Sequence, residues 1–317
     1  MEAVLKFLFL FCCLLFASCE PKISEKKDKA MNERKLSQIL ERERNKLLKE
    51  TTQKINLLSK KTKKYLKTLS DEDRLEWQET WRSAHESFIA LTFLPMDENF
   101  STIEAWPLTP GFVDSIKNHP YSGIVNDFTL EITPKVLKSQ HMITAPSEIS
   151  LGFHVLEYYA FERISEDLNG EKEVNRRRES LISLVSDLLV EDIKTLETES
   201  PMKPDISYPE LITHMKDKVQ RVHIEIRSAE HCAYSGSTGE IVKYQLKIFN
   251  ELLRNTLEVD KYLEETSPGL SAEVESLLTG IENYSTRTET AYLEGLIPEL
   301  IKVEQVLSNF ENRKGGN

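Results

Sequence analysis

The chain has 317 residues, a formal net charge of −11, and charged side chains at 29% of its positions. It is long enough to bury one large core or two ordinary ones. Because the negative balance provides no basic surface for a phosphate backbone, the sequence predicts no nucleic-acid partner.

The first residues are typical of a bacterial export signal. Lys6 supplies a positive charge, the run 7–16 is apolar throughout, and two small residues precede Cys19. This order is similar to the lipobox at which lipoprotein signal peptides are cut. We therefore predict a lipoprotein signal peptide over residues 1–18, with lipidation at Cys19. An ordinary cleaved signal peptide is the alternative, and it would be cut near the same place.

Helix signals dominate after the signal segment. Residues 19–34 are rich in Lys and Glu, which predicts a solvated tether. Apolar residues then recur every three or four positions, as in amphipathic helices. Ser70 is followed by three acidic residues, a pattern typical of a helix N-terminus, and Pro95 would end that helix. Between about 95 and 146 the frequent prolines predict short helices joined by irregular backbone.

Further along, Pro146 would occupy the first turn of a helix that reaches about Arg163. The next apolar period covers 181–189, and the three arginines at 176–178 indicate a solvated face of that helix. Prolines between 200 and 209 mark the best boundary between two halves. In the second half, helices would begin near residues 209, 239, 271 and 288.

No stretch alternates with period two, so no sheet is expected. The predicted fold is all-α, with two packed helical bundles. The first bundle would cover residues 35–200 and the second 201–312, followed by a tail at 313–317. With Cys19 lipidated, Cys232 is the one cysteine left in the mature chain outside the anchor, and we expect it to be a small buried side chain.

The most informative segment surrounds His154 and Glu157. On a helix these two side chains project from nearly the same face, and apolar and aromatic residues share that face. We therefore expect the carboxylate to be buried, where it needs a hydrogen bond, a cation or a metal ion. Imidazole nitrogen with carboxylate oxygen suits iron, zinc or another divalent ion. The alternative is a polar core patch in which the two side chains bind each other or the backbone.

Gly152 precedes this pair. In a helix interior glycine costs about 1 kcal/mol relative to alanine, so its presence indicates close packing against the backbone.

The run from Gly152 to Tyr158 resembles the Gly-x-His-x-x-Glu signature of the imelysin family. Two upstream stretches also resemble that family. The run from Trp81 to Glu86 is similar to its early Trp/Arg helix, and Glu104-Ala105-Trp106-Pro107 is similar to its acidic-x-Trp-Pro loop. The resemblance covers residues 35–312 and is strongest up to about residue 165.

The resemblance implies a two-domain helical architecture, export to the periplasm or outer membrane, and a link to iron acquisition. It also implies a metal site with His154 and Glu157 as ligands, Gly152 as the small motif residue, and Glu86 and Glu104 as further oxygen ligands. The implied cofactor is a divalent or trivalent metal ion, with iron first and zinc second. The implied partners are iron-uptake components and the outer membrane. The lipid anchor would attach the protein to that membrane, either on its periplasmic side or at the cell surface.

Two other functions stay open. The resemblance implies an imelysin-type metallopeptidase as one of them, although the chain lacks the His-Glu-x-x-His pattern of zincins. The inverted His-x-x-Glu-His pattern also fails, because Tyr158 follows Glu157. His85 with Glu86, and His231 with Cys232, are isolated pairs without a second ligand at helical spacing. The sequence thus favours metal handling with no catalysis or only weak catalysis. A surface-exposed lipoprotein that contacts a host is the other alternative.

Overall fold

The computed structural model describes residues 20–96, 100–162, 172–199, 206–257, 259–266, 268–285 and 293–315. Within these ranges the chain forms helices and no strand, with one isolated bridge between Ile116 and His119. The predicted all-α fold is therefore confirmed. None of the helices in the described part combines the length and apolar character needed to cross a bilayer. The signal segment and Cys19 lie outside the described residues.

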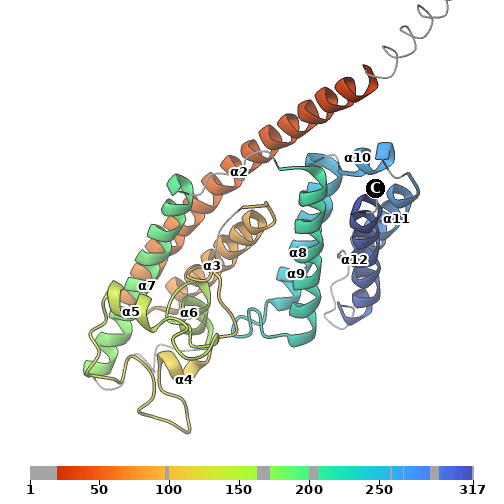
Figure 1. The fold of residues 1–317 in the computed structure, drawn as a ribbon. Coiled ribbons are helices and arrows are strands. Elements are labelled where there is room, and N and C mark those ends of the chain that lie inside the picture. The colour runs from red at the N-terminus through yellow and green to blue at the C-terminus, as the bar shows by residue number, and fades with distance from the viewer. Residues whose placement is uncertain are drawn as a thin grey trace, which may run out of the picture.

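Three long helices form the first group: α2 (Glu20–Thr68), α3 (Asp71–Thr92) and α7 (Lys172–Glu199). α2 packs against both α3 and α7 (Figure 1). The segment predicted as a tether forms the first turns of α2. α3 begins at the predicted cap, where the Ser70 side chain accepts a hydrogen bond from the Asp73 amide at 3.2 Å. Its buried face carries Trp77, Trp81 and Phe88.

Between α3 and α7 the chain forms the predicted short elements. These are α4 (Pro110–Val113), α5 (Pro134–Gln140), α6 (Phe153–Glu157) and the π-helical turn η1 (Tyr158–Glu162). The helix predicted from Pro146 was wrong in its start, because α6 begins only at Phe153. The Glu148 carboxylate turns back to accept hydrogen bonds from the amides of Thr144 and Ala145, which closes a turn instead.

Gly152 is the N-cap of α6 rather than a helix-interior residue, and its φ is +86°. A Cβ at this position would lie 2.4 Å from the Ile103 carbonyl oxygen. The close packing predicted at Gly152 is confirmed, and its placement inside a helix was wrong. The amide of Phe153 donates to the same carbonyl oxygen at 2.9 Å, which fixes the start of α6 against the loop that carries Glu104.

The arginines at the start of α7 do not form a solvated face, so that prediction was wrong for two of the three. Arg178 is buried and forms a bidentate ion pair with buried Asp114, at 2.7 and 2.9 Å. Arg177 donates to backbone carbonyl oxygens between residues 124 and 130. Together the two guanidinium groups attach the irregular segment to α7.

The remaining helices form a second group (Figure 1). In chain order they are α8 (Tyr208–Ser228), α9 (Thr238–Glu251), η3 (Leu252–Thr256), α10 (Val259–Thr266), α11 (Pro268–Ser285) and α12 (Leu293–Gly315). α12 packs along α8, α11 contacts α9, and α9 contacts α3 of the first group. The predicted division into bundles at 35–200 and 201–312 stays a prediction. The boundary predicted after residue 200 falls outside the described residues and stays a prediction.

Candidate metal centre

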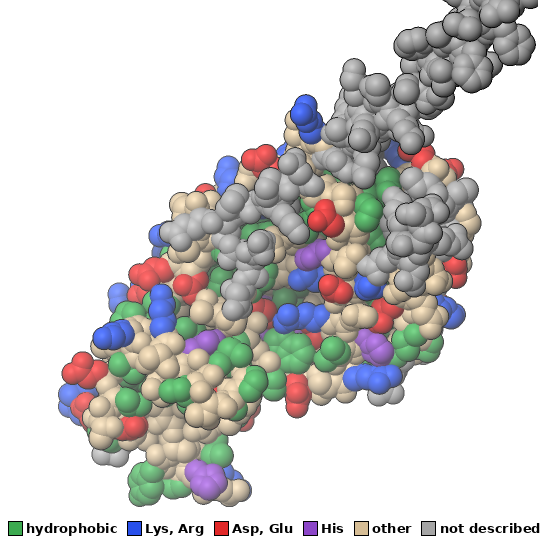
Figure 2. Space-filling model, viewed as in Figure 1, with side chains coloured by type: hydrophobic (Ala, Val, Ile, Leu, Met, Phe, Trp, Pro, Cys, Tyr) green, Lys and Arg blue, Asp and Glu red, His purple; other side chains and the backbone are tan. Residues whose placement is uncertain are grey.

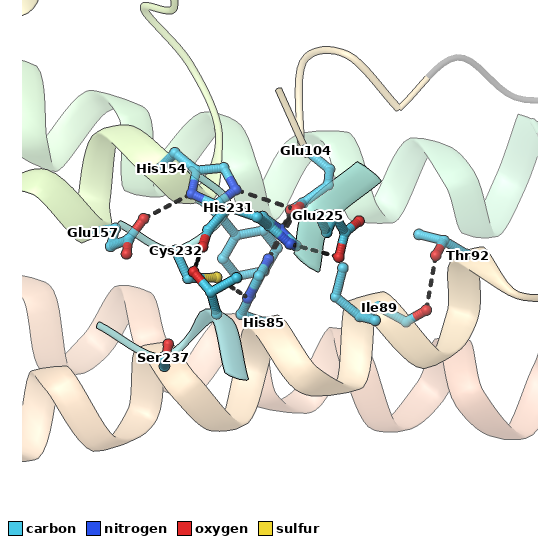
Figure 3. Close-up of polar contacts among 12 residues, drawn as sticks. His85, Ile89, Thr92, Glu104, His154, Glu157, Glu225, His231, Cys232 and Ser237 are labelled. Atoms are coloured by element: carbon cyan, nitrogen blue, oxygen red, sulfur yellow. Dashed lines mark hydrogen bonds and ion pairs between the residues drawn. The ribbon is translucent and has the colours of Figure 1, made fainter. Parts of the chain in front are cut away.

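Four buried side chains from four separate segments meet where the two groups of helices join. His85 comes from α3, Glu104 from the loop after α3, His154 from the first turn of α6, and His231 from the turn after α8. One ligand atom from each of the four lies within 4.8 Å of the others. Figure 3 shows the imidazole rings gathered around the Glu104 carboxylate. Each of these residues is at most 7% exposed.

The Glu104 carboxylate is the point on which the imidazoles converge. His85 Nε2 lies 2.9 and 3.0 Å from its two oxygens. The Nε2 atoms of His154 and His231 lie 3.2 and 2.7 Å from Oε1. A bare nitrogen lone pair would repel a carboxylate oxygen at these distances, so a proton or another cation must lie between each pair of atoms. The geometry therefore concentrates positive charge at one buried point.

Two further carboxylates hold the imidazoles from the outer side. His154 Nδ1 lies 2.7 Å from Glu157 Oε2, and His231 Nδ1 lies 3.0 Å from Glu225 Oε2. The other oxygen of Glu157 accepts hydrogen bonds from the Ser235 amide and hydroxyl, both at 2.8 Å. In metal sites a carboxylate on the far nitrogen fixes the tautomer and leaves Nε2 available to the metal. Both rings have this arrangement.

Electrostatics favour ionised carboxylates in the cluster. Burial alone would raise the pKa of Glu104, but His85, His154 and His231 hold it well below its usual range. Burial alone would lower the pKa of His154, whereas Glu104 and Glu157 together raise it to about 10. In the metal-free protein the carboxylate is therefore charged and His154 keeps its proton.

The other two imidazoles differ from each other. For His231 the effect of burial is outweighed by Glu225 and Glu104, so its pKa is raised. Burial lowers the pKa of His85. The charge of Glu104 acts against this effect, but the other two imidazoles add to it, so the pKa of His85 is lowered overall. A metal ion at Glu104 would thus meet one neutral ring and would displace protons from the other two.

Two indole rings border the cluster and stack on its imidazoles. Trp81 stacks on His85 with ring centroids 4.9 Å apart, and Trp106 stacks on His231 at 5.1 Å. Trp81 also donates a hydrogen bond to the Phe153 carbonyl oxygen at 2.9 Å, which ties α3 to α6. These contacts fix the ring planes of both imidazoles.

The structure brings together three of the four residues predicted as metal ligands. Glu104 and His154 belong to the central cluster. Glu157 lies on the outer side of His154, in a second group with Cys232 whose ligand atoms also lie within 4.8 Å of one another. Glu86 belongs to neither group. It is half-buried, and its charge interacts with Lys54, Glu240 and Arg82. Adjacent helix residues point in different directions, so α3 directs His85 rather than Glu86 into the site.

Two candidate ligands, His85 and His231, were not predicted from the sequence. A signal existed for His85, which follows Trp81 by four residues and precedes Phe88 by three, both of them buried. His231 lies in a turn without periodicity, and no local pattern marks it. Cys232 is buried as predicted, but its Sγ lies 3.6 Å from His85 Nδ1, so it borders the cluster.

The residues present fit a metal ion. Three imidazole nitrogens and one carboxylate oxygen converge at a buried point, and two of the rings have carboxylates on their far nitrogens. Imidazole with carboxylate is a donor set for iron and zinc.

The sequence profile of the imelysin family matches residues 48–299, which is more than half of the chain and includes all four members of the cluster. A search of curated proteins found no match.

Proposed function

The chain belongs to the imelysin family, and on that basis we propose that it binds a metal ion, with iron as the first candidate, and takes part in metal uptake at a bacterial cell envelope. The observation that carries the proposal is the convergence of His85, His154 and His231 on the Glu104 carboxylate. Such a cluster needs a positive charge at its centre.

The donor set supports iron first and zinc second. Imidazole suits iron, zinc, copper and nickel, and a mixed imidazole and carboxylate set is characteristic of non-haem Fe(II) sites. Zinc also accepts three histidines. The raised pKa values of His154 and His231 mean that protons compete with the metal, which moderates its affinity.

The metal assignment predicts a measurable loss in a double variant. Changing His154→Ala together with Glu157→Ala removes one ring and the carboxylate that orients it. Loss of an outer partner alone costs about 10- to 100-fold in affinity, so the purified double variant is expected to bind iron more than about 100-fold more weakly. Calorimetry and elemental analysis measure this, with circular dichroism as the check of folding. Equal iron affinity in both proteins would contradict the proposal.

A peptidase is the competing function, because the resemblance to imelysins also implies a metallopeptidase and catalytic zinc sites use three protein ligands. The carboxylates of Glu157 and Glu225 already accept hydrogen bonds from imidazoles, so neither is poised as a free base for water. The test is cleavage of casein by the purified protein. If a chelator stops the cleavage and the Glu157→Gln variant lacks it, the function is proteolysis and not metal uptake.

For the location we propose an outer-membrane anchor through lipid on Cys19, supported by the residues that precede it. Wild-type protein is expected to incorporate a labelled fatty acid and to sediment with membranes. Cys19→Ser is expected to do neither. Labelling of the Cys19→Ser variant would exclude this anchor, and protease treatment of intact cells would separate surface display from periplasmic residence.

A further inference from the structure

A cavity of about 570 Å³ lies beside the metal centre. Its wall includes Glu104, the carboxylate shared by the three imidazoles, and Trp106, the indole that stacks on His231. A second cavity of about 30 Å³ shares Glu104 with the first and reaches Glu225. Because Asp217 and Arg221 on the wall of the larger cavity are exposed, that cavity connects the solvent with a candidate metal ligand.

The α8 side of this cavity carries basic side chains. His214, Lys218 and Arg221 are spaced by four and three residues, so they share one face of the helix. Figure 2 shows Lys and Arg side chains near the middle of the visible face, where Figure 1 places α8. His214 donates to the Phe93 carbonyl oxygen, and burial lowers its pKa to about 4, so it is neutral. The positive charge comes from the other two.

The positive charges of Lys218 and Arg221 differ in their partners. Arg221 lies over the Trp106 ring at 5.8 Å and approaches Glu225 Oε1 at 3.5 Å. The partly buried Lys218 has no hydrogen-bond or ion-pair partner within the described part of the chain. Burial, with Arg221 nearby, lowers its pKa to about 8, so most of the ammonium stays charged at neutral pH. Two acidic residues also line the cavity: Asp217 at the exposed rim, and Glu104, whose charge the three imidazoles surround.

The rest of the cavity wall combines polar with apolar side chains. The polar residues are Thr92, Ser101 and Glu104, and the apolar ones are Leu94, Met96, Phe100, Trp106 and Met142. Cavities of roughly 300–1,000 Å³ that combine apolar side chains with a few placed polar groups are typical of sites for small organic ligands. A ligand that fits this wall carries negative charge for Lys218 and Arg221 and carbon atoms for the apolar side chains.

We propose that this cavity binds a small organic carboxylate, which lies against Lys218 and Arg221 and accompanies the metal ion at Glu104. The part concerning the metal rests on the proposed function, whereas the anion site rests on the cavity alone. A carboxylate held here would lie beside the one cluster member that lines the cavity, and its oxygen would be available as a further metal ligand. Inorganic phosphate shares the charge but lacks carbon atoms that would contact the apolar side chains of the wall.

Calorimetry with succinate as the probe tests the site in the purified full chain, first without metal. Wild type is expected to bind succinate, and Lys218→Met is expected to bind it about tenfold more weakly, since a charge-assisted hydrogen bond is lost. Lys247→Met is the matched control, because Lys247 is exposed on α9 and does not line the cavity. No binding to wild type, or equal binding by the two variants, would overturn the proposal. Phosphate binding as tight as succinate binding would overturn the carboxylate class.

Zinc titrations with and without succinate test the link to the metal. Succinate is expected to raise zinc affinity in wild type, and zinc is expected to raise succinate affinity by the same factor. Without succinate, Lys218→Met is expected to bind zinc as wild type does. Succinate binding with no binding of either zinc or iron would overturn the proposed function and leave the anion site standing. If zinc and succinate both bind but neither changes the affinity for the other, the proposal that the carboxylate accompanies the metal ion would be wrong.

Discussion

Replacing Glu104 with glutamine is expected to weaken metal binding by more than about 100-fold, the upper end of what loss of an outer partner produces. Glutamine keeps the size of the side chain but removes the charge on which the three imidazoles converge. The metal-free protein should also become less stable, because the raised pKa values of His154 and His231 depend in part on that carboxylate. Competition with a chromophoric chelator measures affinity, and urea unfolding measures stability.

Two further variants provide comparisons for the Glu104→Gln result. Glu225→Gln changes the outer partner of His231 and leaves the central carboxylate in place, so the loss of metal affinity should lie within about 10- to 100-fold. Glu86→Gln changes the residue next to His85 without touching the cluster, and metal affinity should not change. If Glu86→Gln weakened the metal as much as Glu104→Gln, the assignment of Glu104 as the central ligand would be wrong.

Gly152→Ala is expected to lower the free energy of unfolding by about 2–6 kcal/mol, the sum of backbone strain and overpacking. Gly152 has a φ of +86°, and a Cβ there would lie 2.4 Å from the Ile103 carbonyl oxygen. Since backbone atoms cannot move aside cheaply, the loop holding Glu104 must shift, and metal affinity should fall as well. Urea unfolding followed by circular dichroism measures the stability change.

Gly280→Ala provides the control for this substitution. Gly280 lies in α11, and a Cβ there would meet nothing within 4 Å. Alanine favours a helix by about 1 kcal/mol over glycine, so this variant should be as stable as wild type or more stable. Equal stability of Gly152→Ala and Gly280→Ala would show that the α6 cap has no special conformational requirement.

The helices could be predicted because their signals are local. Ser70 and the acidic residues after it sit at the start of α3, and the apolar period of α7 needs no knowledge of its neighbours. The start of α6 could not be predicted in this way. The contact between Gly152 and Ile103 joins segments 49 positions apart, and Pro146 alone favoured an earlier start. The burial of Arg178 likewise depends on Asp114, 64 positions away.

The candidate site was predictable only where its pattern was local or matched a resemblance. His154 and Glu157 are three residues apart, and Glu104 lies in a stretch similar to the family's loop. His231 meets Glu104 across 127 positions, which no spacing rule reaches. The role of Glu157 also depends on three-dimensional contacts. Its bonds to His154 Nδ1 and to Ser235 place it behind the ring rather than at the central carboxylate.

The four members of the cluster come from four segments, and the shortest separation between Glu104 and an imidazole is 19 residues. An unfolded chain therefore contains no ready-made chelate of these groups, unlike a zinc finger, whose closely spaced ligands capture the ion as the domain forms. The four groups therefore meet only once the chain has folded. If the proposed site binds a metal ion, that ion would enter after folding, and its removal would leave a folded protein that can bind the ion again.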